Sequence, residues 1–144
     1  MNKVTTFLLV VLGGIGPARS AEVPTKVSAT PLMQRALTDI AGKEGLLLEV
    51  NIPPGGSSAS HRHDADVFVY VLAGSVIMQV AGGEPQTRVA GQTFFESPTD
   101  VHVRSENASK TKPAKLLVFF VKNAGAPATR PAAPTEGPTE GKSP

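Results

Sequence analysis

Alternation of apolar and polar residues is clearest in Gly45–Ile52. From Leu46 onward every second residue there is apolar, and the polar residues Glu49 and Asn51 lie between them. Side chains in a strand point alternately to opposite faces, so this pattern predicts a strand with one apolar face. The segment Pro53–Ser58 ends it, because proline cannot donate to a strand ladder and glycine permits a turn.

A second segment, Val67–Leu72, is apolar at every position. This pattern predicts a strand that is covered on both faces. Alternation sorts its residues into an inner row (Val67, Val69 and Val71) and an outer row (Phe68, Tyr70 and Leu72). The outer row needs a cover, which the N-terminal strand or a second copy of the chain could supply. A homodimer through the Phe68/Tyr70/Leu72 face is therefore one expectation.

Short segments with the same character recur along the rest of the chain, separated by glycine, proline and polar residues. The chain has 14 glycines and 13 prolines, which favour a turn-rich all-β fold. We therefore predict an antiparallel β-barrel or jelly roll. The further strands are expected at residues 75–80, 86–89, 93–96, 101–104 and 116–122.

The length of 144 residues indicates a single domain. We place that domain at residues 43–122 and an N-terminal extension at residues 21–42. Residues 32–40 of the extension predict an edge strand, with a short helix as the alternative.

The N-terminus is typical of a secretory signal. Lys3 supplies a positive charge, Phe7–Leu12 form a short apolar core, and Ala18–Ser20 offer small residues for cleavage after Ser20. The apolar run is far shorter than the roughly 20 residues that a membrane-spanning helix needs. A secreted or periplasmic protein without a membrane span is therefore expected.

The opposite end, residues 123–144, is rich in Pro, Ala, Thr and Gly. No large apolar residue follows Val121, so this segment cannot bury enough surface to offset its ordering entropy, and we predict a disordered tail.

Charge and cysteine content narrow the function further. Residues 1–20 hold two basic residues and no acidic one, so 14 − 2 = 12 basic residues face 12 acidic residues in the remaining chain. A formally neutral chain argues against nucleic acid as a partner. The chain has no cysteine and hence no disulfide.

The chain has 3 histidines. His61 and His63 are two positions apart on a predicted strand, so both face the same side. His102 follows the glycine-led segment Gly91–Glu96. If the three imidazoles meet, they form a site for one divalent transition metal, because neutral imidazole suits Zn, Cu, Fe and Ni.

These spacings resemble the first motif of the cupin superfamily, a His-x-His pair between two glycines. Gly55, His61, His63 and Gly74 match it, and Val67 stands where the motif has glutamate.

The second cupin motif is matched by Gly91 and His102. Ser97, Thr99 and Glu106 occupy the positions of its proline, glycine and asparagine. The resemblance spans residues 43–122, and the whole chain resembles a small single-domain cupin with an export signal.

The resemblance implies a jelly-roll barrel that holds Fe, Mn, Ni, Zn or Cu, with His61, His63 and His102 as ligands. Val67 cannot ligate a metal. Glu96 could serve as a ligand, as a hydrogen-bond acceptor behind a ligand, or only as a surface carboxylate; Asp66 would need a β-bulge to reach the site. A site of three histidines completed by water or substrate is also consistent.

The substrate pocket is expected beside the metal, lined by Val67, Gln79, Phe94 and Arg104. Because neighbours in a strand alternate, either Gln79 or Met78 faces inward. Arg104 shares a face with His102 by the i+2 rule, so it could hold an anionic substrate group or lie at the rim.

Together these features predict an exported metal-binding cupin. The first expectation is a metal-dependent dioxygenase acting on a small organic molecule such as an enol or diketone; isomerase or lyase chemistry is less favoured. The alternative is a module that binds a small ligand or metal without turnover. No catalytic residue is identified.

Overall fold

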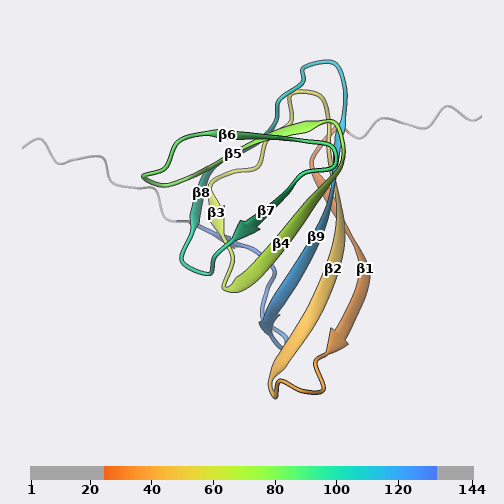
Figure 1. The fold of residues 1–144 in the computed structure, drawn as a ribbon, viewed down its shortest axis with the longest axis vertical. Helices are drawn as coiled ribbons and strands as arrows, with labels where there is room; N and C mark the ends of the chain where they lie inside the picture. Colours follow the sequence, from red (N-terminus) through yellow and green to blue (C-terminus); the bar gives the residue numbers. More distant parts are fainter. Residues whose placement is uncertain (1–24, 133–144) are drawn as a thin grey trace, which may run out of the picture.

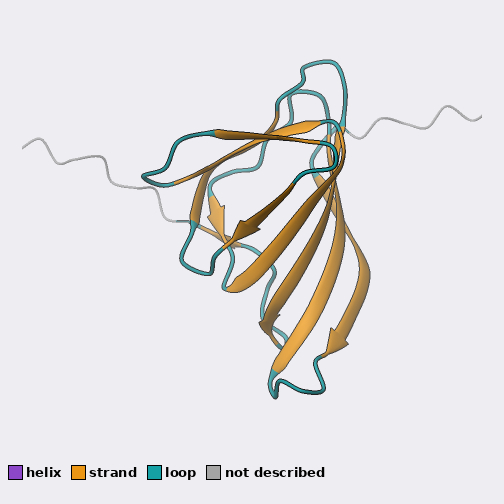
Figure 2. Cartoon of the chain, viewed as in Figure 1, coloured by secondary structure: helices purple, strands orange, loops and turns teal. Residues whose placement is uncertain are grey.

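Ten β-strands make up the described part of the chain, residues 25–132 of a computed structural model. They form two antiparallel five-stranded sheets, ordered β1-β2-β9-β4-β7 and β10-β3-β8-β5-β6 (Figures 1 and 2). Residues 25–132 contain no helix, and hence no helical segment that could cross a membrane. The all-β prediction is confirmed. The strands are β1 (Ser28–Ala36), β2 (Lys43–Ile52), β3 (His61–Arg62), β4 (Ala65–Ala73), β5 (Ser75–Val80), β6 (Gln86–Val89), β7 (Thr93–Glu96), β8 (Val101–Asn107), β9 (Ala114–Asn123) and β10 (Arg130–Pro131).

The register of the first sheet brings distant parts of the sequence into one row across four strands. Leu46 of β2 is paired with Phe120 of β9, Phe120 with Val67 of β4, and Val67 with Glu96 of β7. Figure 1 shows β2, β9 and β4 running side by side. Cross-strand partners point to the same face, and all four side chains are buried. We call these four residues the Glu96 row.

The inner face of this sheet forms the core. The inner row of β4 is buried, as are Leu48 of β2 and Val118 of β9, which lie in the same cross-strand row as Val69. Burying such a side chain stabilises the fold by roughly 1.5–3 kcal/mol relative to leaving it in water. The alternating side chains of Gly45–Ile52 and Val67–Leu72 therefore correspond to the inner and outer faces of one sheet.

The outer face of the same sheet carries exposed aromatic side chains. Phe68 is 51% exposed, and its ring centroid lies 5.3 Å from that of Phe95 and 6.5 Å from that of Phe119. These rings come from the adjacent strands β4, β7 and β9. The predicted outer row is thus exposed in the single chain. The N-terminal strand does not cover it, because β1 pairs its backbone with β2 at the edge of the sheet.

The edge strand itself occupies Ser28–Ala36, a few residues before the predicted range 32–40, and the alternative of a short helix is wrong. A register shift between Pro31 and Met33 interrupts its pairing with β2. Proline and a bulge are common at sheet edges, where they limit pairing with other chains.

The prediction of a disordered tail is wrong for the first residues after β9. Residues 124–132, which we call the C-terminal strap, are held by polar contacts, and Ala128 also packs against the core. Ala124 N–H donates to Gly42 O at 2.9 Å, Lys122 Nζ donates to Ala126 O at 2.5 Å, and β10 pairs with β3. Composition alone missed these contacts, because their partners lie on other strands. The rest of the predicted tail and the predicted signal, residues 1–20, lie outside the described residues.

A buried ion pair joins the strap to the first sheet. Lys122 of β9 and Glu44 of β2 are both buried and hydrogen-bonded to each other, and Gly125 N–H donates to Glu44 Oε1 at 3.3 Å. The hydrogen bond from Lys122, aided by one from Gln34, lowers the pKa of the Glu44 carboxyl from its ordinary value of 4.5. A carboxyl whose pKa is lowered by folding stabilises the folded state above its unfolded-state pKa, and that contribution is lost as pH falls through the folded-state value.

We therefore expect Glu44→Gln to change the pH dependence of stability. The melting temperature of the parent protein should fall steeply as pH drops below 4.5, and that of the variant should fall less, because one linked carboxyl is gone. At pH 7 the variant should melt lower, because Lys122 keeps its charge without its partner. Thermal unfolding from pH 3 to 7, with the exposed Glu84→Gln as control, measures this; parallel curves for parent and Glu44→Gln would contradict it.

Candidate metal centre

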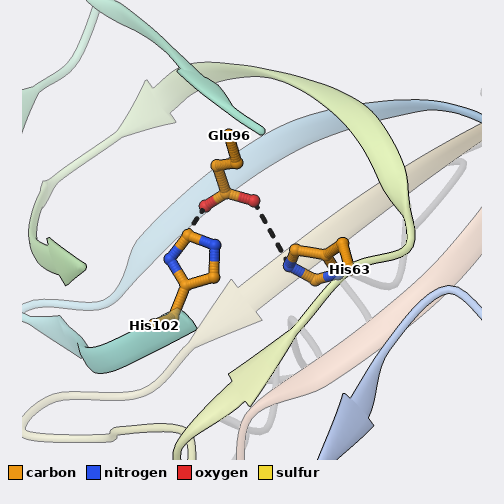
Figure 3. A group of neighbouring side chains, drawn as sticks. All are labelled: His63, Glu96 and His102. Atoms are coloured by element: carbon orange, nitrogen blue, oxygen red, sulfur yellow. Dashed lines mark ion pairs between the residues drawn. The ribbon is translucent and has the colours of Figure 1, made fainter. Parts of the chain in front are cut away.

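Three buried side chains from the two sheets converge at the end of the Glu96 row. His63 directly follows β3, His102 lies in β8, and Glu96 ends β7. His63 Nε2 is 3.2 Å from Glu96 Oε2, and His102 Nδ1 is 3.7 Å from Glu96 Oε1 (Figure 3). One ligand atom from each residue lies within 4.8 Å of the others. The carboxylate thus stands between the two imidazoles, as Figure 3 shows.

Burial makes this cluster costly unless its polar groups are paired. His63 and Glu96 are each 5% exposed and His102 is 2% exposed. Neither ring nitrogen of His102 has a hydrogen-bond partner among the described residues. A buried polar atom without a partner costs roughly 1–3 kcal/mol, so such an atom in a folded protein needs an explanation. A divalent cation bound by the cluster would give His102 its partner and offset the Glu96 charge.

The pKa values of His63 and His102 are shifted in opposite directions. Burial disfavours the charged form of His63, but the hydrogen bond to Glu96, the Ala128 carbonyl and the Glu96 charge outweigh burial, so the pKa of His63 is raised. Burial dominates at His102 and lowers its pKa, despite the Glu96 charge. His102 is therefore a neutral imidazole at pH 7, as a metal ligand must be, and a metal at His63 competes with a proton.

Backbone carbonyls fix the tautomers of the other two imidazoles. His63 Nδ1 lies 2.7 Å from Ala128 O, and His61 Nδ1 lies 2.8 Å from Ala59 O. A carbonyl can only accept, so each Nδ1 carries a proton, and in the neutral form of either ring the lone pair is on Nε2. At His63 a metal would replace the proton that Nε2 donates to Glu96. Ligands oriented by such outer hydrogen bonds are typical of protein metal sites. The strap residue Ala128 was not foreseen, because nothing in its sequence context marks it.

His61 lies beside the cluster. Its ring centroid is 5.1 Å from that of His63 and 5.2 Å from that of His102, with which it is paired across β3 and β8. The structure thus brings the three histidines together. The compact group of ligand atoms, however, comprises His63, Glu96 and His102, and His61 stands next to it.

The carboxylate missing at residue 67 is present on the neighbouring strand. Val67 is fully buried and lies directly opposite Glu96 in the β4–β7 ladder. Side chains so paired have Cβ atoms about 4.5–5.5 Å apart, so Glu96 can reach a point that a side chain at residue 67 would reach. Asp66 is exposed and pairs regularly with Val121, so the bulge that it would need is absent from this stretch of β4. Glu96 is therefore the carboxylate of the site, and it is not on the surface.

A cavity of about 430 Å³ opens beside the cluster. His61, His63 and Glu96 line one part of it, and Phe94 lines it as the sequence predicted. Most of the remaining wall is apolar, and the larger part of its apolar residues comes from β2, β4 and β9. The serine and threonine residues that line it are Ser58, Ser60, Ser105 and Thr129.

The other predicted pocket residues lie elsewhere. Val67 is fully buried in the sheet and does not line this cavity. Gln79 donates to Gly83 O at 2.9 Å and lines a separate cavity of about 170 Å³ that also borders His102. Met78 is the inward-facing member of that pair and lines the large cavity.

The prediction for Arg104 fails for a specific reason. Gln79 of β5 is paired with Arg104, but the next residue, Val80, is paired with His102, so β8 bulges at Val103. The bulge breaks the i+2 rule. Ser105 therefore lines the cavity, whereas Arg104 forms an ion pair with Glu106 at 2.6 Å and does not line it.

Solved structures with the same architecture include proteins of several kinds. A conserved protein with a double-stranded β-helix domain from Klebsiella pneumoniae is 18% identical, with a TM-score of 0.59 over 78% of this chain and 90% of that one. The polyketide cyclase RemF from Streptomyces resistomycificus is 21% identical, with a TM-score of 0.59 over 78% of this chain and 75% of that one. The DMSP lyase DddQ from Ruegeria pomeroyi is 20% identical, with a TM-score of 0.61 over 78% of this chain, which spans 54% of that enzyme.

These likenesses confirm the predicted jelly roll, and at such identities they concern the fold alone. No match to a curated protein sequence was found. The family model for the cupin domain matches residues 48–120, about half of the chain. The chain therefore belongs to the cupin family.

Proposed function

We propose that this cupin is an exported metal-dependent enzyme, a dioxygenase that acts on a small organic molecule. The observation that carries the proposal is the unpartnered, buried His102 next to Glu96 and His63, at one end of an apolar cavity. Nitrogen and oxygen donors of this kind suit Fe, Mn, Ni, Zn or Cu. A redox-active ion held there would supply the electron transfer that dioxygen chemistry requires.

The residues have separate roles in this proposal. His63 and His102 hold the ion, and His61 is placed to join them. Glu96 either completes the ligand set or accepts the proton of an enolic substrate at its carboxylate, since it lines the cavity wall. The apolar wall excludes water and strengthens the electrostatic interactions inside.

Elemental analysis of the full protein, followed by oxygen-electrode assays with diketones, tests this function. One bound transition metal per chain and substrate-dependent oxygen consumption are expected. Bound metal without oxygen consumption would favour a non-catalytic binding module or lyase chemistry. A protein that takes up no metal would contradict the metal site and, with it, every metal-dependent function.

Two further parts of the proposal concern location and assembly. Export would remove residues 1–20, so mass spectrometry should find Ala21 at the N-terminus of the mature chain.

The exposed rings of Phe68, Phe95 and Phe119 form a contiguous apolar patch of the kind that marks interaction sites, and we assign it to a homodimer. Light scattering should give twice the chain mass, and Phe68→Glu should give the monomer.

His102→Ala should lower metal affinity more than tenfold, because even the loss of an outer hydrogen bond to a ligand costs about 10- to 100-fold. Arg104→Ala is the matched control: it lies two residues away in β8 but outside the cavity, so metal content should equal that of the parent. Metal titration of the two variants measures this. Equal affinity in His102→Ala and the parent would remove His102 from the site.

Exchanging Val67 of β4 and Glu96 of β7, which face each other, tests whether the carboxylate at this position binds the metal. Glu96→Val alone should weaken metal binding more than tenfold. Adding Val67→Glu should restore most of it, because the carboxylate returns from the opposite position in the same ladder. A folded double variant, judged by its circular dichroism, that binds no more metal than Glu96→Val would show that residue 67 cannot reach the ion.

A further inference from the structure

The large cavity is elongated along the strands, and the strand register shows which residues lie at each end. The metal cluster lies level with the Glu96 row, where the ring centroids of His63 and Phe120 are 5.3 Å apart. Val50 lines the same cavity and stands four residues along β2 from Leu46, about 13 Å away at the rise of a strand. The cavity therefore extends along the strands, with the metal cluster near one end and Val50 away from it.

The walls between these ends are apolar. The inward side chains of the long strands line it, among them Leu48, Val69, Leu116 and Val118. Besides the cluster and the adjacent His61, the polar side chains that line it are hydroxyls, which can donate to a neutral oxygen but carry no charge. With a volume of about 430 Å³, the cavity falls within the range of about 300–1,000 Å³ that is usual for sites of small organic ligands.

Among the described residues, no lysine or arginine lines the cavity. Several cations on the neighbouring strands are instead paired with carboxylates. These pairs are Arg62–Asp64, Arg130–Asp64, Arg104–Glu106, Lys115–Glu49 and Lys122–Glu44.

Charge balance then limits the ligand. A divalent ion together with the Glu96 carboxylate leaves one positive charge at the metal end, which one anionic oxygen neutralises. A second charge at the Val50 end would lie against the apolar side chains of Val50, Ile52 and Leu116 without a charged partner, which is unfavourable. We infer that the cavity takes a hydrophobic organic molecule with a single acidic group, bound at the metal end, and rejects molecules with a charge at the far end. This ligand class rests on the proposed metal site.

The test uses the full protein loaded with Zn²⁺, which is redox-inert, and two matched probes. Benzoylacetone has a chelating enol and a phenyl group; its para-carboxyl derivative has the same head and adds a remote charge. In calorimetric titrations benzoylacetone should bind at least tenfold more tightly than the carboxylated probe. Equal binding of the two probes would overturn the inference.

Adding a cation at the far end should reverse the preference. Val50 is half-buried at the cavity wall, so Val50→Lys can place its ammonium group there and should favour the carboxylated probe over benzoylacetone. Val103→Lys, on the exposed side of β8, is the control and should keep the preference of the parent. If Val50→Lys retains its Zn²⁺ but binds the carboxylated probe no better than the parent does, the assigned direction of the cavity is wrong.

Naphthalene binding to the metal-free protein separates this inference from the proposed function. Saturable binding, detected by fluorescence, is expected because the apolar wall does not depend on the metal. Naphthalene binding together with no diketone binding to the Zn²⁺ form would overturn the metal-dependent function and leave the hydrophobic ligand class standing. Absence of both would overturn the ligand class itself.

Discussion

The Glu96 carboxylate, buried between two imidazoles in an otherwise apolar interior, is the interaction on which the site depends. A buried charge must be offset. Among the chain's own residues His63 does this, because its raised pKa favours a protonated imidazole next to Glu96. His102 does not contribute a positive charge in this way, because its pKa is lowered. Both its ring nitrogens are without hydrogen-bond partners among the described residues. The asymmetry between two histidines around one carboxylate is what points to a cation.

The strand ladder explains how a cupin site can survive the loss of its usual glutamate. Val67 and Glu96 face each other across β4 and β7, so a carboxylate on either strand reaches the same interior position. In the proposed metal site the carboxylate is thus set by a position in the barrel and not by one motif. Substituting the motif glutamate by valine also makes that part of β4 fully apolar, which suits its place in the core.

Strand positions and inward rows could be predicted from the sequence because they follow from alternation, as in Gly45–Ile52 and Val67–Leu72. The meeting of the histidines could be predicted from their spacing and from the cupin resemblance. Arg104 could not be placed, because the bulge at Val103 depends on pairing with β5. The choice between Met78 and Gln79 likewise needed the register. The strap could not be found from composition, because polar contacts to Gly42, Asp64 and His63 hold it and each of these is distant in sequence.

The strap also has a consequence for how the protein matures. His63 is oriented by the carbonyl of Ala128, and Thr129 and Pro131 close part of the cavity wall. These residues come after His63, Glu96 and His102 in the sequence, so a nascent chain has the three side chains of the cluster before it has the carbonyl that orients one of them. The complete cluster therefore needs the strap as well as its own three residues, and proteolytic trimming or a bulky fusion near residue 130 would act directly on the orientation of His63.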